Sequence, residues 1–237
     1  TTDSLSNYIS GAILFDETIN QKTMSGDAFP AFLKNTGIIP GIKVDTGAKS
    51  FSCHKNEKIT EGLDNLPERM EKYKAQGAKF AKWRAVITPG DNIPTKACMI
   101  ANAHALARYA SICQEVDIVP IVEPEVLMDG SHDINECFEI TNETQSITFE
   151  ALDKLDVNFS GIILKPNMVI SGTNCEKQAS AEEIAELTIK CLANNVPNEV
   201  PGIAFLSGGQ SDEDASNNLS HINQINTNPW KTTFSYG

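Results

Sequence analysis

Short apolar runs alternate with longer segments of mixed polarity along most of the chain. Each run holds several consecutive apolar residues and is bounded by turn-forming residues, which is typical of buried strands. Strands are therefore predicted at residues 9–15, 39–44, 79–87, 118–125, 161–166, 202–207 and 232–236.

Most of the segments between these runs have the apolar spacing of a helix. Pro67 and Gly77 fit the start and end of the first helix, and Ser180 with Glu183 has the form of a capping box. Ser211 is the expected cap of the last helix. Helices are predicted at residues 66–76, 97–114, 133–154, 180–194 and 212–221.

This alternation predicts a parallel sheet with both faces covered, for which two architectures remain open. One is an open doubly wound sheet, and the other is a closed (β/α)₈ barrel. The seven strands and the length of 237 residues favour an α/β TIM barrel that lacks one strand, with residues 1–237 as a single domain. In such barrels the chemistry lies at the C-terminal ends of the strands.

Gly161–Val169 contains the most informative charged residue, Lys165, inside a run that otherwise reads as a buried strand. Lysine is rarely buried, and burial favours the neutral amine, which attacks carbonyl groups. The alternative is a lysine at a strand end whose stem lies along the sheet while its head reaches water.

Charge also interrupts three other apolar runs near their C-terminal ends. Because side chains alternate between the two faces of a strand, charged residues two positions apart share a face. Several strands that end in charge indicate a site. The residues are Lys43, Lys82, Arg84, Glu123 and Glu125.

A second motif, Phe205–Ser211, leads from a strand through Ser207, Gly208 and Gly209 into a helix. Free backbone N–H groups and the absence of Cβ atoms allow a phosphate to approach closely. The alternative is a tight connection without a ligand. The segment Phe234–Gly237 is expected to supply the other half of the phosphate cradle.

The chain has a net charge of −12, which argues against a nucleic-acid partner because no basic stripe is present to neutralise phosphates. Cations gathered at one barrel mouth would nevertheless form a local positive region. The expected substrate is a phosphorylated or carboxylated small molecule.

No run approaches the about 20 apolar residues of a membrane helix, and the six cysteines form no C-x-x-C pair. We therefore expect reduced, mostly buried thiols, a cytoplasmic location and no membrane partner. The histidines show no metal-ligand spacing, and Asp129, His132 and Asp133 are interpreted as part of a solvated loop. No metal is predicted.

Seven segments together, in order along nearly the whole chain, resemble class I fructose-1,6-bisphosphate aldolases. These Schiff-base enzymes of glycolysis and gluconeogenesis reversibly cleave fructose 1,6-bisphosphate to dihydroxyacetone phosphate and glyceraldehyde 3-phosphate. The segments are Gly41–Asp45, Phe80–Arg84, Ala107–Cys113, Val119–Glu125, Leu164–Met168, Phe205–Ser211 and Phe234–Gly237.

The resemblance implies a catalytic role for four residues. Lys165 would form the imine with dihydroxyacetone phosphate, and Lys82 would help to keep its amine neutral by like-charge repulsion. Glu123 would be the general acid and base, and Glu125 would tune the pair.

The same resemblance implies that Ser207, Gly208, Ser235 and Gly237 bind the C1 phosphate. Arg84 and Lys43 would meet the C6 phosphate or the sugar hydroxyls, although a carboxylate could hold Lys43 instead. No cofactor is implied, and the expected partners are sugar phosphates and further subunits of a homotetramer.

The chain also departs from the pattern of the family. The family has an earlier strand with a catalytic aspartate and, after the final Ser-Tyr-Gly, an arginine, a helix and a tail. We therefore expect a partial sequence whose activity in isolation is uncertain. Another Schiff-base enzyme, such as a transaldolase, and a non-catalytic scaffold protein remain as alternatives.

Overall fold

The computed structural model describes residues 5–237, so the first four residues of the predicted domain lie outside it. Its centre is a parallel sheet of seven strands in the order β1-β2-β5-β6-β7-β8-β9. Each predicted strand is found. The bounds are β1 Gly11–Leu14, β2 Ile39–Lys43, β5 Phe80–Ile87, β6 Val119–Val126, β7 Ile163–Leu164, β8 Gly202–Phe205 and β9 Lys231–Phe234.

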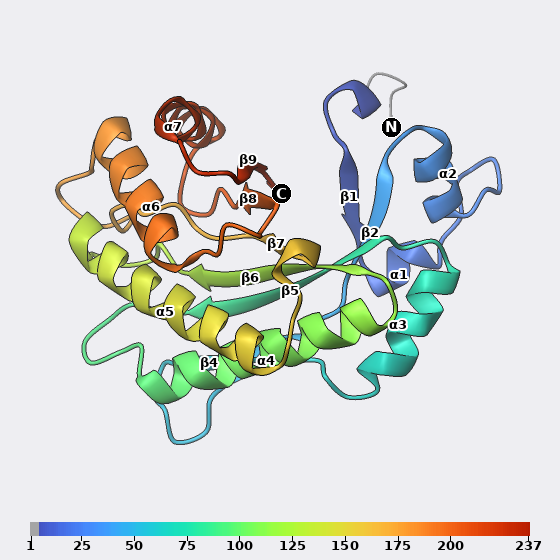
Figure 1. Cartoon of the computed structure of the whole chain (residues 1–237), viewed down its shortest axis with the longest axis horizontal. Coiled ribbons are helices and arrows are strands. Elements are labelled where there is room, and N and C mark those ends of the chain that lie inside the picture. Colours follow the sequence, from blue (N-terminus) through green and yellow to red (C-terminus); the bar gives the residue numbers. More distant parts are fainter. Residues whose placement is uncertain (1–4) are drawn as a thin grey trace.

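The sheet is strongly curled, with β1 and β2 at one end of the curl and β8 and β9 at the other (Figure 1). Its strands follow the order of the chain, whereas a doubly wound sheet reverses direction at a switch point. The architecture is therefore the incomplete TIM barrel that the sequence predicts.

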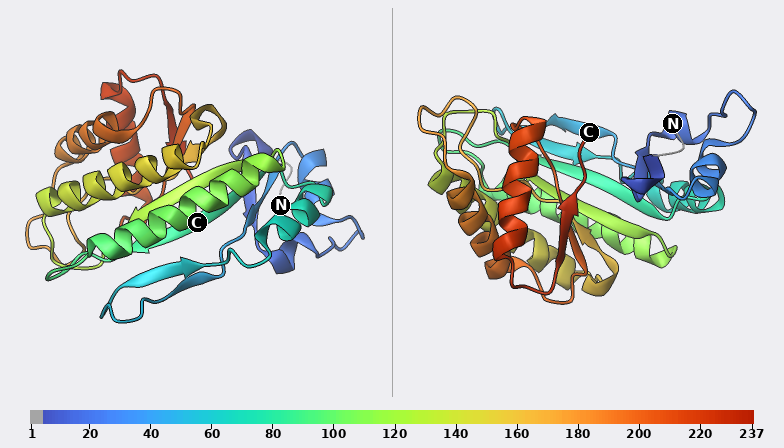
Figure 2. Two further views of the ribbon diagram at one scale, coloured as in Figure 1. Left: turned by 60° about the horizontal axis from the view of Figure 1, so that its bottom comes forward. Right: turned by 90° about the horizontal axis from the view of Figure 1, so that it is seen from above.

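All five predicted helices are present, and the larger helices lie along the outer face of the curl (Figures 1 and 2). Capping boxes at Asp133 and Ser180 begin two of them. Within residues 5–237, no helix is long and apolar enough to cross a membrane. The bounds are α1 Asp16–Ile19, α2 Phe29–Asn35, α3 Leu66–Ala75, α4 Lys96–Glu115, α5 Ile134–Lys154, α6 Ala181–Asn195 and α7 Asp212–Ile225, with short 3₁₀ turns at Leu5–Asn7 and Phe159–Gly161.

Helices cover only the outer face of the sheet, so the prediction that both faces are covered is wrong in this respect. On β5, Trp83 packs outward against Tyr109 of α4, with ring centroids 5.6 Å apart. Since side chains alternate along the strand, Lys82 and Arg84 point to the inside of the curl. The inner face is therefore lined by the side chains of the sheet itself.

The chain segment that connects β2 to α3 forms a hairpin of two strands, β3 (Gly47–Ser50) and β4 (Lys58–Glu61), which projects from the sheet (Figure 2). It was not predicted, because its lysine-rich sequence lacks apolar alternation. The backbone N–H of Thr60 donates to Asn102 of α4, and the Thr60 hydroxyl donates to the carbonyl of Arg84. These contacts fix the hairpin to α4 and to the strand that carries Arg84.

Candidate active site

Lys165, Glu123 and Lys82 form a buried cluster on three adjacent strands or their ends. The ammonium of Lys165 lies 2.6 Å from Oε1 of Glu123, and that of Lys82 lies 3.2 Å from Oε2. The two lysine side chains are 10% exposed and the glutamate side chain is 2% exposed. The solvated alternative for Lys165 is therefore wrong, since its head is held inside the protein.

The register of the strands brings these side chains together. Arg84 is paired with Glu123 between β5 and β6, and Val122 is paired with Leu164 between β6 and β7. The N–H of Lys165 then donates to the carbonyl of Val122 at 2.8 Å. Lys165 therefore follows directly after the short strand β7, next to the face of β6 that carries Glu123.

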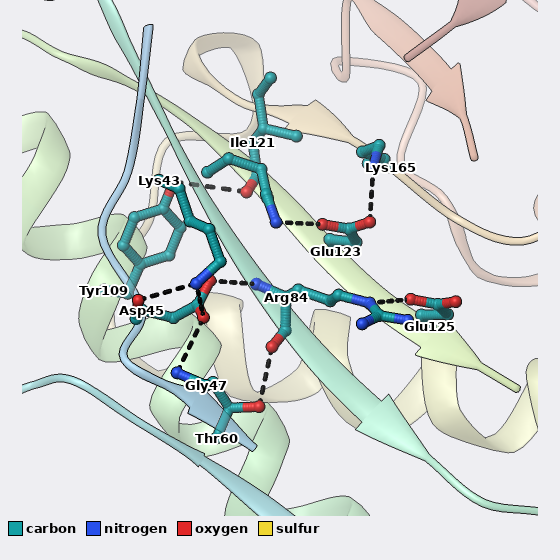
Figure 3. A network of polar contacts seen from close by, with 11 residues as sticks. Lys43, Asp45, Gly47, Thr60, Arg84, Tyr109, Ile121, Glu123, Glu125 and Lys165 are labelled. Carbon is teal, nitrogen blue, oxygen red and sulfur yellow. Dashed lines mark hydrogen bonds and ion pairs between the residues drawn. The ribbon is translucent and has the colours of Figure 1, made fainter. Parts of the chain in front are cut away.

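Arg84 forms an ion pair with Glu125, one step further toward the C-terminal ends of the strands (Figure 3). The Arg84 side chain is 42% exposed, while that of Glu125 is 7% exposed. The hydrogen bond to Glu125 raises the pKa of the guanidinium, against the opposing effect of burial. Glu125 therefore fixes one edge of the guanidinium, which keeps its charge at every physiological pH.

Lys43 is held by a carboxylate, as the sequence allowed. Its ammonium lies 2.5 Å from Oδ1 of Asp45 and 2.9 Å from the Asp45 carbonyl. The Asp45 carboxylate also accepts the backbone N–H groups of Gly47 and Arg84, at 3.1 and 3.2 Å (Figure 3). Asp45 thus ties the end of β2 to β5 beside Arg84, a role that no sequence motif indicated.

The charges of the four ion pairs do not cancel, because Glu123 takes part in two of them. Lys43, Lys82, Arg84 and Lys165 face three carboxylates, those of Asp45, Glu123 and Glu125, which leaves one formal positive charge. This excess lies at one end of a protein whose net charge is −12. The arrangement suits an anionic ligand.

The predicted phosphate motif lies at the same end of the sheet, after β8. A Cβ on Gly208 would stand 3.3 Å from Oε1 of Glu125, so the turn lies directly beside the charged cluster. Gly209 has a φ of +78°, and a Cβ there would meet Met128 at 2.5 Å, so this position requires glycine. Ser207 is half-buried and Gly208 is exposed.

The segment after β9 lies next to this turn. The N–H of Ser235 donates to the carbonyl of Phe205 at 2.8 Å, which continues the pairing of β8 with β9. Ser235 is half-buried and Gly237 is exposed. The structure therefore brings the two halves of the predicted cradle to adjacent strand ends.

In the loop containing Asp129, His132 and Asp133, the two aspartates are exposed, as the sequence predicted, but His132 is not. His132 is only 8% exposed, and burial lowers the pKa of its imidazole. Asp133 caps α5 by accepting the N–H groups of Asn135 and Glu136. Polar sequence here serves packing and helix capping, and in residues 5–237 no three His, Cys, Asp or Glu side chains are grouped to hold a metal ion.

A protein-family model described as fructose-bisphosphate aldolase class-I matches residues 1–237. The chain belongs to the class-I fructose-bisphosphate aldolase family. The reaction of this family is the one that the resemblance implied, the reversible cleavage of fructose 1,6-bisphosphate through a lysine Schiff base. It also favours this family over the transaldolases.

Aldolases of this family from distant organisms align with the whole chain. A probable class 1 fructose-bisphosphate aldolase of Xanthomonas campestris pv. campestris is 56% identical over 237 residues, which cover 100% of this chain and 71% of the relative. The cytosolic fructose-bisphosphate aldolase 4 of Arabidopsis thaliana is 48% identical over 238 residues, covering 100% of this chain and 61% of the relative.

A solved aldolase structure has the same fold. The fructose-bisphosphate aldolase of Plasmodium falciparum, determined in complex with TRAP and a small-molecule inhibitor, superimposes with a TM-score of 0.97 at 47% identity. The alignment covers 100% of this chain and 69% of that one. The curled sheet of seven strands is thus the aldolase barrel over the aligned part.

Proposed function

We propose that Lys165 carries the Schiff base by which this aldolase cleaves fructose 1,6-bisphosphate. The observation that supports this role is the buried triad, in which one carboxylate, Glu123, contacts the ammonium groups of both Lys165 and Lys82. A proton can therefore leave Lys165 to a group already in hydrogen-bond contact. The neutral amine is the form that attacks a carbonyl carbon.

Glu123 acts as general acid and base in the steps that form the imine. Lys165 attacks the C2 carbonyl of the ketose to give a carbinolamine, and the departing hydroxyl takes a proton from Glu123 and leaves as water. In the hydrolysis step the Glu123 carboxylate takes a proton from the water that attacks the iminium carbon. Lys82, at 3.2 Å from the other oxygen, keeps the carboxylate in place and opposes a second positive charge on Lys165.

The iminium carbon then accepts the electron pair of the C3–C4 bond as that bond breaks. The C4 hydroxyl gives its proton to a base, a role that the family resemblance assigns to the aspartate of an earlier strand, the aldehyde glyceraldehyde 3-phosphate leaves, and an enamine remains on Lys165. Protonation at C3 and hydrolysis release dihydroxyacetone phosphate. Glu125, which holds Arg84, tunes the charge next to Glu123.

The two phosphates occupy opposite sides of this cluster in the proposal. Ser207, Gly208, Ser235 and Gly237 bind the C1 phosphate through hydroxyl and backbone N–H groups. Arg84 and Lys43 meet the C6 phosphate or nearby hydroxyls, with Asp45 orienting Lys43. A hollow of about 550 Å³ lies beside Lys43 and Asp45 and is also lined by Arg69 and Lys72.

The proposal also includes a cytoplasmic location, a homotetramer and a single barrel domain over residues 1–237. The location is supported by relatives described as cytosolic in Arabidopsis thaliana and cytoplasmic in Pisum sativum. The tetramer rests on resemblance to the family. The continuous sheet of seven strands supports one domain.

Borohydride trapping with dihydroxyacetone phosphate, mapped by peptide mass spectrometry, tests the role of Lys165. An adduct is expected on Lys165 in the wild-type chain and is expected to be lost in Lys165→Ala. Lys79→Ala is the matched control, because Lys79 is exposed at the opposite end of β5. Circular dichroism establishes folding. A folded wild-type chain without an adduct on Lys165 would contradict the proposal and favour the scaffold alternative.

A further inference from the structure

β6 is paired along its whole length with β5 but only briefly with β7. The β5 register runs from Phe80 to Ile87, whereas β7 pairs at two residues, Ile163 and Leu164. The Lys165–Glu123 contact joins β6 to the segment that follows β7. Its geometry therefore depends on what holds residues 165–169 against β6 after the strand pairing has ended.

Proline removes the next N–H donor of β6 on the side that faces β7. The carbonyl of Val122 and the N–H of Val126 both point toward β7, so residue 124, midway between them, points the same way. Residue 124 is proline and has no N–H to donate, whereas Pro166 faces β8, where its carbonyl accepts the N–H of Leu206 at 3.1 Å. The β6–β7 ladder therefore lacks a backbone donor at this point.

The side chain of Asn167 bridges the gap. Its Oδ1 accepts the N–H of Val126 at 3.0 Å, and its Nδ2 donates to Thr141 Oγ1 of α5 and to the Met168 carbonyl, both at 3.1 Å. Asn167 is 2% exposed. One buried amide thus links the end of β6, the segment after Lys165 and the helix outside them.

We propose that Asn167 is a positioning residue, which sets the distance between Lys165 and Glu123 by holding the segment after β7 in register with β6. Asn167 lies two residues after Lys165, and its partner Val126 lies three residues after Glu123. A change of a few tenths of an ångström in this register moves the amine relative to the carboxylate, and catalytic rates are sensitive to such shifts. The inference rests on the proposed role of Lys165.

Asn102 provides a matched control. It is also 2% exposed, and its amide is likewise fully engaged: it accepts from Thr60 N, donates to the carbonyls of Lys58 and Cys98, and makes one longer contact of 3.5 Å to Cys98 Sγ. These bonds join α4 to the hairpin. Leucine has nearly the shape of asparagine without its polar atoms, so Asn167→Leu and Asn102→Leu delete equivalent bonds in two different places.

The first measurement needs no substrate. Reductive methylation, read by peptide mass spectrometry, gives the labelling of Lys165 relative to the exposed Lys34. Asn167→Leu is expected to raise this ratio at least threefold, because Lys165 is released from Glu123, while Asn102→Leu leaves it unchanged. An unchanged ratio in folded Asn167→Leu, or an equal rise in both variants, would overturn the inference.

The second measurement is trapping with dihydroxyacetone phosphate. Asn167→Leu is expected to trap about tenfold more slowly at saturating substrate, with the half-saturating concentration unchanged within twofold, since the phosphate cradle is not altered. If Asn167→Leu does not fold, Thr141→Val, which removes one partner of the amide, is judged by the same criteria. A wild-type chain that gives no adduct counts against the role of Lys165 in the reaction, whereas the labelling ratio still decides the role of Asn167.

Discussion

The ammonium of Lys165 lies 2.6 Å from Oε1 of Glu123, across the boundary between β7 and β6. The second oxygen of the same carboxylate faces Lys82. One carboxylate can therefore exchange protons with the amine that reacts while a second cation holds it in place. Substitution of one residue at these contacts therefore tests the role of each group.

Glu123→Gln keeps the size of the side chain but removes its ability to transfer protons. We expect trapping of dihydroxyacetone phosphate on Lys165 to slow by about 100-fold, the lower end of what a general acid–base group contributes. Glu68→Gln, on the exposed side of α3, is the control. Trapping at the wild-type rate in folded Glu123→Gln would assign the proton transfer to another group.

Arg84→Lys replaces a planar, two-pronged cation by a single point of charge. We expect a hexitol bisphosphate to compete about tenfold less well against dihydroxyacetone phosphate in the trapping assay, with trapping itself unchanged. The difference arises because only the bisphosphate reaches the Arg84 end of the site. Arg108→Lys, exposed on α4, is the control, and an equal loss with a monophosphate competitor would contradict the assignment.

His132 makes stability depend on pH. Burial lowers the pKa of its imidazole in the folded protein, so the unfolded chain binds a proton more readily. The free energy of unfolding should therefore be largest above the ordinary histidine pKa of about 6.5 and fall as the pH drops below it. Urea unfolding between pH 7.5 and 5 measures this slope. It should shrink in His132→Gln but not in His104→Gln, and an unchanged slope in His132→Gln would refute the prediction.

The cysteines report on packing of the helices. Cys98, Cys113, Cys137 and Cys191 are buried, and burial raises the pKa of the Cys98 thiol to about 11 and that of Cys191 to about 12. Only the thiolate reacts readily with iodoacetamide. At pH 8, exposed Cys53 should alkylate at the rate of a free thiol, and the four buried residues only in denaturant. Equal rates on the untreated chain would show that α4–α6 are not packed as described.

The sequence predicted the elements whose pattern is local. Every long helix and every strand of the barrel has its own apolar period, and the capping boxes at Asp133 and Ser180 mark helix starts within four residues. α2 and the β3–β4 hairpin were not predicted, because α2 is short and the hairpin strands contain lysine in place of apolar alternation. Contacts of Thr60 with α4 and β5, distant in sequence, stabilise that hairpin.

The site was predictable as far as charge near strand ends reveals it. Lys43, Lys82, Arg84, Glu123 and Glu125 share the inner face of the sheet, as the alternation of faces predicts, although Lys82 and Arg84 lie within β5 and not at its C-terminal end. Residues that act through hydrogen bonds to distant backbone groups give no such signal. Asp45 and Asn167 read as ordinary turn residues until their partners on β5 and β6 are known.

The curl of the sheet has a consequence for the length of the substrate. Lys43 on β2 and Ser207 after β8 are separated by β5, β6 and β7, a path of about 19 Å along a sheet with strands about 4.8 Å apart. That path is longer than a hexose bisphosphate, and only curvature brings the two ends within its span. A substitution that flattens the sheet should therefore weaken binding of a two-phosphate sugar first, while the contact of Lys165 with Glu123, between neighbouring strands, stays intact.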